Sequence, residues 1–195
     1  MNFKGYLLLM EKSLPVFNKT SIFNDISELS EGALDKYSDK EPLAMQAFPE
    51  NISITDHPYK KEGRIFKRGF SKNSILKIFN ELNEELDKHS FSRNNRTFLL
   101  FKAFGDVDVK FSGQIWKKEN KLIIDFFNGN MPSGRDWNPH HSEVVNIENP
   151  KILESEYAEI TKRILKDIEW LDEGAYLDFS LLNNGDFFYH DLSFH

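Results

Sequence analysis

Residues 174–195 read GAYLDFSLLNNGDFFYHDLSFH, two apolar, aromatic-rich runs on either side of Asn183-Asn184-Gly185. An Asn-Gly pair between such runs is a strong short-range signal for a β-hairpin. Each run carries one acidic residue among apolar neighbours, Asp178 in the first and Asp191 in the second. The predicted hairpin therefore holds two acids among apolar side chains, and the group that neutralises these acids is a clue to function.

The length of the turn determines how the two acids face each other. If Asn184-Gly185 is a two-residue turn, Asn183 pairs with Asp186 and Asp178 pairs with Asp191. Directly opposed carboxylates repel, and a carboxylate among apolar side chains is costly to desolvate without a partner. A divalent cation is one such partner, and a buried Arg, Lys or backbone cap is another. An ordinary hairpin with solvent-facing Asp side chains is the third interpretation.

The composition predicts a soluble, cytoplasmic, globular protein. The chain has 195 residues, 39% of them hydrophobic and 18 of them Phe, which is enough for a substantial core. It has no Cys, which excludes disulfides and thiolate chemistry. It has no apolar run near the ~20 residues that span a membrane. A formal net charge of −6 disfavours binding to nucleic acid.

One run is basic against this acidic background. Six Lys and Arg residues fall within thirteen positions: Lys60, Lys61, Arg64, Lys67, Arg68 and Lys72. The run suits the polyphosphate of a nucleotide, and the alternative is a solvated face. Residues 64–70 alternate apolar and basic side chains, which predicts a half-buried strand with Lys67 and Arg68 on opposite faces.

Hydrophobic periodicity predicts helices and strands along the whole chain. In the first half these are helices over 3–12 and 25–37, an extended piece over 14–23, strands over 43–48 and 64–70, a loop over 50–63, and a helix with a stripe from Ile75 to Leu86 that Ser71 or Asn73 caps. In the second half these are a strand over 97–104 that is apolar on both faces, a hairpin of 106–116 and 121–127, a loop over 128–141, a helix over 155–171 and the hairpin over 174–195. This order predicts an α+β fold with helices packed on one side of a mostly antiparallel sheet.

Three separated stretches carry a family resemblance. Phe3-Lys4-Gly5 with Leu14-Pro15-Val16 is similar to an opening in which a Lys precedes a short helix and a Leu-Pro-Val-Pro segment. Residues 97–130 resemble a strand, hairpin and glycine-bearing loop that line adenine and phosphate sites. Asp178, Asp191 and Ser193 map onto an acid followed by Glu-x-Asn. Together these stretches resemble the nucleotide-binding domain of the phosphoenolpyruvate synthase and pyruvate phosphate dikinase family, which has an ATP-grasp fold.

The resemblance implies one ATP-grasp-like domain over 1–195, with a small N-terminal lobe over 1–95 and a C-terminal lobe over 96–195. It implies that ATP is bound with Mg²⁺, that Asp178 and Asp191 hold the metal, and that these two acids are the catalytic residues. The candidate residues for the nucleotide are Lys4, Lys67, Arg68, Leu100 and Lys102. The implied activity is phosphotransfer or carboxylate–amine ligation on a small-molecule or peptide substrate.

The sequence departs from the family at three positions, the first being Phe17, which stands where the second Pro of the Leu-Pro-Val-Pro segment would be. Gln46 stands where the family has an Arg, and Ser193 is a poorer metal ligand than Asn. The 195 residues leave no room for the family's phosphohistidine and pyruvate domains, so phosphoenolpyruvate synthesis is not expected. The departures support a second hypothesis, a non-catalytic descendant of the fold that acts as a binding or interaction module. A third hypothesis is an unrelated α+β protein whose acidic surface meets a protein partner.

Histidines give a weaker prediction. His140 and His141 lie in a Gly- and Pro-rich loop that suits a mobile lid, and His190 and His195 lie in the hairpin. Adjacent histidines point apart in an extended chain, so His140 and His141 are a poor pair for one metal. The sequence contains no Walker loop, no Gly-x-Ser-x-Gly and no His-Glu-x-x-His motif.

Overall fold

The computed structural model describes residues 3–16, 20–49, 65–94, 96–103, 108–130, 138–152 and 154–194. They form two compact units: a main unit of Met1–Val16 with Gly105–His195, and an inserted unit of Phe17–Phe104. This division differs from the predicted lobes 1–95 and 96–195, because the first helix packs with the second half of the chain. Among the described residues, no helix is long and apolar enough to cross a membrane.

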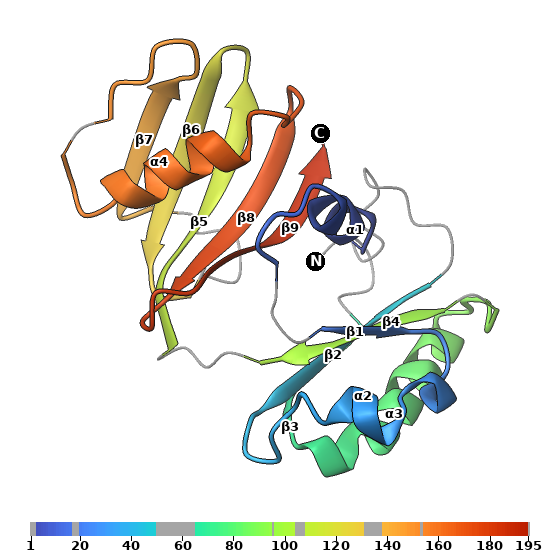
Figure 1. The fold of residues 1–195 in the computed structure, drawn as a ribbon. Coiled ribbons are helices and arrows are strands. Elements are labelled where there is room, and N and C mark those ends of the chain that lie inside the picture. The colour runs from blue at the N-terminus through green and yellow to red at the C-terminus, as the bar shows by residue number, and fades with distance from the viewer. Residues whose placement is uncertain are drawn as a thin grey trace. The chain divides into compact units, whose positions relative to one another are not determined.

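The inserted unit is an antiparallel sheet with its helices on one face (Figure 1). Its elements are β1 (Ser21–Phe23), η1 (Ile26–Glu28), α2 (Glu31–Leu34), β2 (Leu43–Phe48), β3 (Phe66–Phe70), η2 (Lys72–Ser74), α3 (Ile75–Lys88) and β4 (Thr97–Lys102). The strand order is β1-β4-β2-β3, so β4 is internal, as its apolar residues on both faces predicted. The buried residues of α3 are Ile75, Phe79, Leu82 and Leu86, which confirms the predicted stripe.

The main unit is a five-stranded antiparallel sheet with α4 across one face (Figure 1). Its elements are α1 (Phe3–Glu11), β5 (Val109–Lys118), β6 (Lys121–Asn128), β7 (His141–Asn146), α4 (Ala158–Asp167), β8 (Ala175–Leu182) and β9 (Phe187–Phe194). The strand order is β7-β6-β5-β8-β9. Both sheets are antiparallel with helices on one face, so the predicted α+β class is confirmed.

The core of the main unit lies on the face that α4 covers. Phe126, Phe179 and Ile164 are fully buried there. A side chain at Gly113 would collide with this packing, because an added Cβ would lie 2.4 Å from the Phe179 ring and 2.3 Å from the backbone oxygen of Asp125. The absence of a side chain at position 113 therefore lets the Phe179 ring lie directly over β5.

Helix α1 and the residues after it cover the β9 edge of the main sheet. A Cβ added at Gly5 would lie 2.1 Å from the backbone oxygen of Leu192, so the helix backbone packs directly on the strand. The Tyr189 N–H donates to the Pro15 carbonyl at 2.7 Å. These contacts explain why the first sixteen residues belong to the main unit.

The turn between β8 and β9 is longer than predicted. The Leu182 N–H donates to the Asp186 carbonyl at 2.8 Å, which leaves residues 183–185 as a three-residue loop. Gly185 has φ +90°, the conformation that such a loop requires at its last position. With a three-residue loop and no other irregularity, Asp178 would pair with His190 instead of Asp191, and the predicted opposition of the two acids would be lost.

A β-bulge restores the pairing. Phe179 pairs with Tyr189, whereas Asp178 pairs with Asp191, so His190 is the additional residue on β9. The predicted opposition of the two acids is therefore confirmed, although the predicted two-residue turn is wrong. The loop and the bulge offset each other.

Four element predictions need correction. Residues 25–37 form η1 and α2 rather than one helix, because Asp25 and Ser30 each accept a backbone N–H and so begin a new turn. Helix α3 follows η2 and has Ser74 at its N-cap, where Ser71 or Asn73 was predicted; neither Ser71 nor Ser74 makes a side-chain cap bond. The predicted helix over 155–171 is the shorter α4, and the predicted loop over 128–141 leads into β7. The predicted loop over 50–63 lies outside the described residues.

Candidate active site

The face of the main sheet opposite α4 carries a row of polar side chains, here called the polar row. From β9 to β7 its cross-strand neighbours are Asp191, Asp178, Gln114, Asp125 and Ser142. Neighbours in such a row have Cβ atoms about 4.5–5.5 Å apart. Because side chains alternate along a strand, the same strands that bury Phe179 on one face present these polar groups on the other.

The two acids at the β9 end of the row are buried. Asp178 is 6% exposed and Asp191 is 5% exposed. Two carboxylates held opposite each other and away from water favour a positive charge between them. Mg²⁺ is commonly bound by one or two carboxylates together with phosphate oxygens and water, so this donor pair fits that ion. Within the described ranges, no group of three or more His, Cys, Asp or Glu is placed to hold a metal.

Gln114 joins the polar row to two aromatic side chains. Its Nε2 donates to the Tyr176 hydroxyl at 2.7 Å, and its Oε1 accepts from the Trp116 Nε1–H at 3.2 Å. Gln114 is 3% exposed and lies directly opposite Asp178. The sequence interpretation missed this residue, because only the pairing of β5 with β8 places it opposite Asp178.

The bulge brings His190 to the same end of the sheet as the acids. Its Nε2 lies 3.2 Å from the Oγ of Ser180 on β8. Bulges often re-aim a side chain at a functional site. The structure thus gathers His190 and Ser180 near Asp178 and Asp191, whereas the sequence singled out His190 without a neighbour.

The predicted phosphate-binding cations lie on α1 of the main unit and on β3 of the inserted unit. Lys4 is exposed on α1 of the main unit. Lys67 and Arg68 are exposed on β3 of the inserted unit, and their pairing with successive residues of β2 places them on opposite faces, as predicted. The Lys67 Nζ lies 3.4 Å from Glu81 Oε2. Lys60, Lys61 and Arg64 lie outside the described residues.

The other two predicted nucleotide-binding residues, Leu100 and Lys102, lie on β4. Leu100 is fully buried in the core of the inserted unit, and its carbonyl accepts a hydrogen bond from the Tyr37 hydroxyl at 2.9 Å. The Lys102 Nζ lies 3.2 Å from Glu41 Oε1. Both residues have structural contacts of their own, and their assignment to a nucleotide stays a prediction.

His141 has a packing role in the main unit. Its ring stacks on Tyr157, with centroids 4.6 Å apart and an interplanar angle of 8°. Its Nε2 lies 3.2 Å from Glu143 Oε1, and Glu143 Oε2 accepts from the Thr161 hydroxyl at 2.6 Å. These contacts fasten β7 to α4. The neighbouring His140 accepts a weak bond from the Asn128 N–H at 3.4 Å, and His195 lies outside the described residues.

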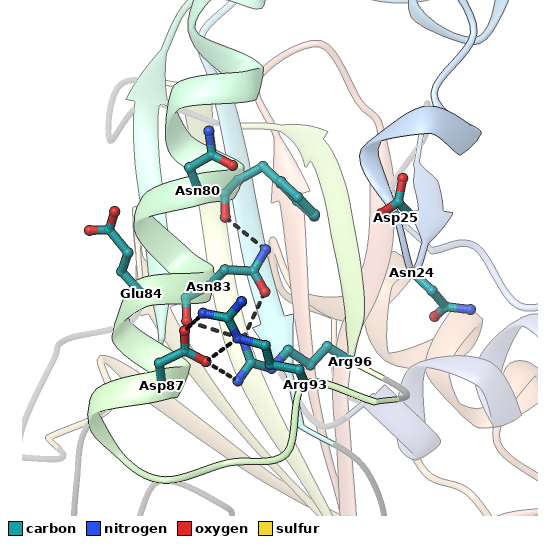
Figure 2. A pocket seen from close by; sticks show the side chains of 9 residues that line it. Asn24, Asp25, Asn80, Asn83, Glu84, Asp87, Arg93 and Arg96 are labelled. Atoms are coloured by element: carbon teal, nitrogen blue, oxygen red, sulfur yellow. Dashed lines mark hydrogen bonds and ion pairs between the residues drawn. The ribbon is translucent and has the colours of Figure 1, made fainter.

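A separate cavity of about 420 Å³ lies in the inserted unit, beside α3 (Figure 2). Its wall includes Arg96, which is 3% exposed and donates five hydrogen bonds. The acceptors lie on Asn83, Asp87, Phe91 and Ser92. Figure 2 shows Asp87 held by both Arg93 and Arg96. Hydrogen bonds from Arg93 and then Arg96 lower the pKa of Asp87, so the network fastens the end of α3 to the start of β4.

Comparison with known proteins identifies the fold. No protein-family model and no curated protein matches the sequence. Solved structures do match: the D-alanyl-alanine synthetase A of Vibrio cholerae has a TM-score of 0.56 and 11% identity over 99% of this chain and 54% of that one. An L-amino acid ligase from Bacillus licheniformis has a TM-score of 0.54 and 13% identity over 100% and 42%. A carboxyaminoimidazole ribonucleotide synthase from Aspergillus clavatus, complexed with ATP, has a TM-score of 0.54 and 10% identity over 98% and 44%.

The fold is ATP-grasp-like. The predicted fold is thus confirmed. At these identities the likeness shows the fold alone, and the chain spans about half the length of the ATP-grasp structures named above. The narrower resemblance to the phosphoenolpyruvate synthase family stays a prediction, because these structures are ligases and synthases of other kinds.

Proposed function

We propose that this chain binds ATP with Mg²⁺ and ligates a carboxylate to an amine, with Asp178 and Asp191 as metal ligands. The observation that carries the proposal is the pairing of two buried carboxylates in direct opposition, on the polar face of an ATP-grasp-like sheet. Two charged carboxylates in direct opposition repel each other, and a cation bound between them offsets that repulsion. Ligation is favoured over other phosphotransfer because two of the structures reported above are amino-acid ligases or synthetases.

Each group has a part in this proposal. When bound, Mg²⁺ supplies charge neutralisation and alignment of the phosphates. Asp178 and Asp191 hold the metal, and Gln114 keeps the neighbouring position of the row fixed through its two hydrogen bonds. The proposed nucleotide contacts are Lys4, Lys67, Arg68, Leu100 and Lys102. A small molecule or a peptide supplies the carboxylate and the amine.

Isothermal titration with a non-hydrolysable ATP analogue and Mg²⁺ tests the proposal. Wild-type protein is expected to bind, and Asp178→Asn is expected to lose the Mg²⁺-dependent part of the binding. Asp186→Asn is the matched control, because Asp186 is an exposed carboxylate on the same hairpin. No heat at millimolar analogue, or equal binding by all three proteins, would contradict the proposal.

A non-catalytic descendant of the fold is the second candidate function. The observation that favours it is Gln46, which is 2% exposed on β2 at the position where the resembled family has an Arg. In that case the Asp178→Asn and Asp191→Asn proteins would keep the biological activity of the wild type. Loss of activity in folded variants would argue against this candidate.

A further inference from the structure

A second row of side chains adjoins the polar row on the same face of the main sheet, and is here called the apolar row. From β8 to β7 its cross-strand neighbours are Tyr176, Trp116, Ile123 and Val144. Trp116 is 45% exposed and Val144 is 64% exposed. These side chains point away from the core, which lies on the face that α4 covers. Adjoining exposed apolar groups mark surfaces that bind ligands or other proteins.

At one end the apolar row borders a cavity of about 260 Å³. Trp116, Tyr176 and Ile123 line it, and Lys118 and Glu173 contribute to its polar part. The Lys117 ammonium donates to the Leu171 carbonyl, so its charge is engaged there. An apolar cavity of about 150 Å³ is enough to bind benzene, so the present cavity has room for one aromatic ring with a substituent.

The two aromatic walls are held in place before any ligand arrives. The Trp116 and Tyr176 rings meet edge to face, with centroids 5.8 Å apart and an interplanar angle of 88°. Gln114 bonds to both, through Nε2 to the Tyr176 hydroxyl and through Oε1 to the Trp116 Nε1–H. Fixed rings lose little freedom on binding, and a flat ring can join such a pair by further edge or face contacts.

Tyr176, which lines the cavity, also lies close to the candidate active site along β8. Tyr176 precedes Asp178 by two residues on β8, which corresponds to about 7 Å along a strand. Gln114 touches both aromatic rings and lies directly opposite Asp178. A molecule that reacts beside the carboxylates therefore reaches the aromatic walls with a single side chain.

We propose that the cavity beside Trp116 and Tyr176 binds an aromatic ring carried by the substrate. The inference rests on the proposed ligation and deepens it, because it names an aromatic carboxylate or amine as the substrate class. The ring lies against Trp116 and Tyr176, and the reacting group lies toward Asp178. The cavity holds only the ring. The rest of the substrate lies outside the cavity and carries the reacting carboxylate or amine.

Isothermal titration without nucleotide, using L-phenylalanine and L-alanine as probes, tests the ring site. Wild-type protein is expected to bind L-phenylalanine about tenfold more tightly than L-alanine. Trp116→Leu should remove this preference, whereas Trp116→Phe should keep most of it. Leu76→Ala is the matched control, because Leu76 is a 57% exposed apolar residue in the inserted unit.

Three outcomes would overturn the inference. They are equal binding of the two amino acids, no binding of L-phenylalanine at millimolar concentration, and an unchanged preference in Trp116→Leu. Analytical sedimentation of the same proteins tests whether a second copy of the chain occupies the apolar row instead. A wild-type dimer that dissociates in Trp116→Leu would assign the row to that second copy and would also overturn the inference. The amino-acid titration contains no nucleotide, so its result is independent of the ATP-analogue titration. If the analogue fails to bind but the preference for L-phenylalanine remains, the proposed function is wrong and the ring site is still supported.

Discussion

The two faces of the main sheet are built from the same strands but differ in what they bury, because only the face opposite α4 buries carboxylates. One face is apolar, is covered by α4 and includes the fully buried Phe126 and Phe179. The other presents the polar row, with the buried acids Asp178 and Asp191 at one end. Burial of a large apolar side chain contributes about 1.5–3 kcal/mol to the free energy of unfolding. Burial of two like charges that face each other is unfavourable until a positive group neutralises them. Stability should therefore depend on the first face and response to ligand on the second.

The largest expected effect is a difference in stability between substitutions at two adjacent residues that lie on opposite faces. Phe179→Ala removes a fully buried ring that packs against Phe126 and Phe187, and should lower the free energy of unfolding by about 3–5 kcal/mol. Ser180→Ala, one residue further along β8 on the polar face, removes one hydrogen bond to His190 and should lower it by about 1 kcal/mol. Urea denaturation of both variants measures the difference. Equal losses would mean that the polar face also carries packing energy.

A smaller effect is expected from the polar contact on the apolar face. The Tyr189 hydroxyl donates to Asp167 Oδ2 at 3.1 Å, and the side chain is fully buried. Tyr189→Phe removes this bond and should cost about 1 kcal/mol at neutral pH. Phe187→Leu, which alters the same face without touching a hydrogen bond, is the comparison for packing alone.

The Tyr189 contact also predicts a dependence on alkaline pH. Burial, and then the charge of Asp167, raises the pKa of Tyr189. The folded chain keeps the phenol protonated while the unfolded chain releases the proton near pH 10, so stability is full below that pH and falls above it. Urea denaturation at neutral pH and above about pH 10 should show a smaller alkaline loss in Tyr189→Phe than in wild type. An equal loss in both proteins would contradict this assignment.

The same contrast explains how much of the structure the sequence could predict. Alternation in residues 106–116 predicted one strand, and the Asn-Gly pair between two apolar runs predicted the terminal hairpin. The opposition of Asp178 and Asp191 was predicted from a turn that does not occur, and it holds because His190 forms a bulge. A bulge depends on contacts with neighbouring strands, and no local sequence pattern around His190 predicts it.

Residues brought together across strands were harder to predict than residues within one strand. Gln114 is a functional candidate only because the register places it opposite Asp178 and between two aromatic rings. Strand order β5-β8 is a tertiary property, so Gln114 could not be selected from its own neighbourhood. β7 was missed for a related reason, since the Gly and Pro residues before it signal a loop and its pairing with β6 decides the strand.

The smallest effect is expected to have the opposite sign. Asp191→Asn removes one of two directly opposed buried carboxylates, so without metal it should raise the free energy of unfolding by up to about 1 kcal/mol. With Mg²⁺ and an ATP analogue the order should reverse, because the wild type gains stability from binding that the variant lacks. Thermal unfolding in chelator and in Mg²⁺ with analogue measures both states. Asp186→Asn, at the exposed turn, should respond to neither condition differently from wild type. A variant less stable than wild type in chelator would show that hydrogen bonds to Asp191 outweigh its repulsion with Asp178, and the polar face would then support the fold as the apolar face does.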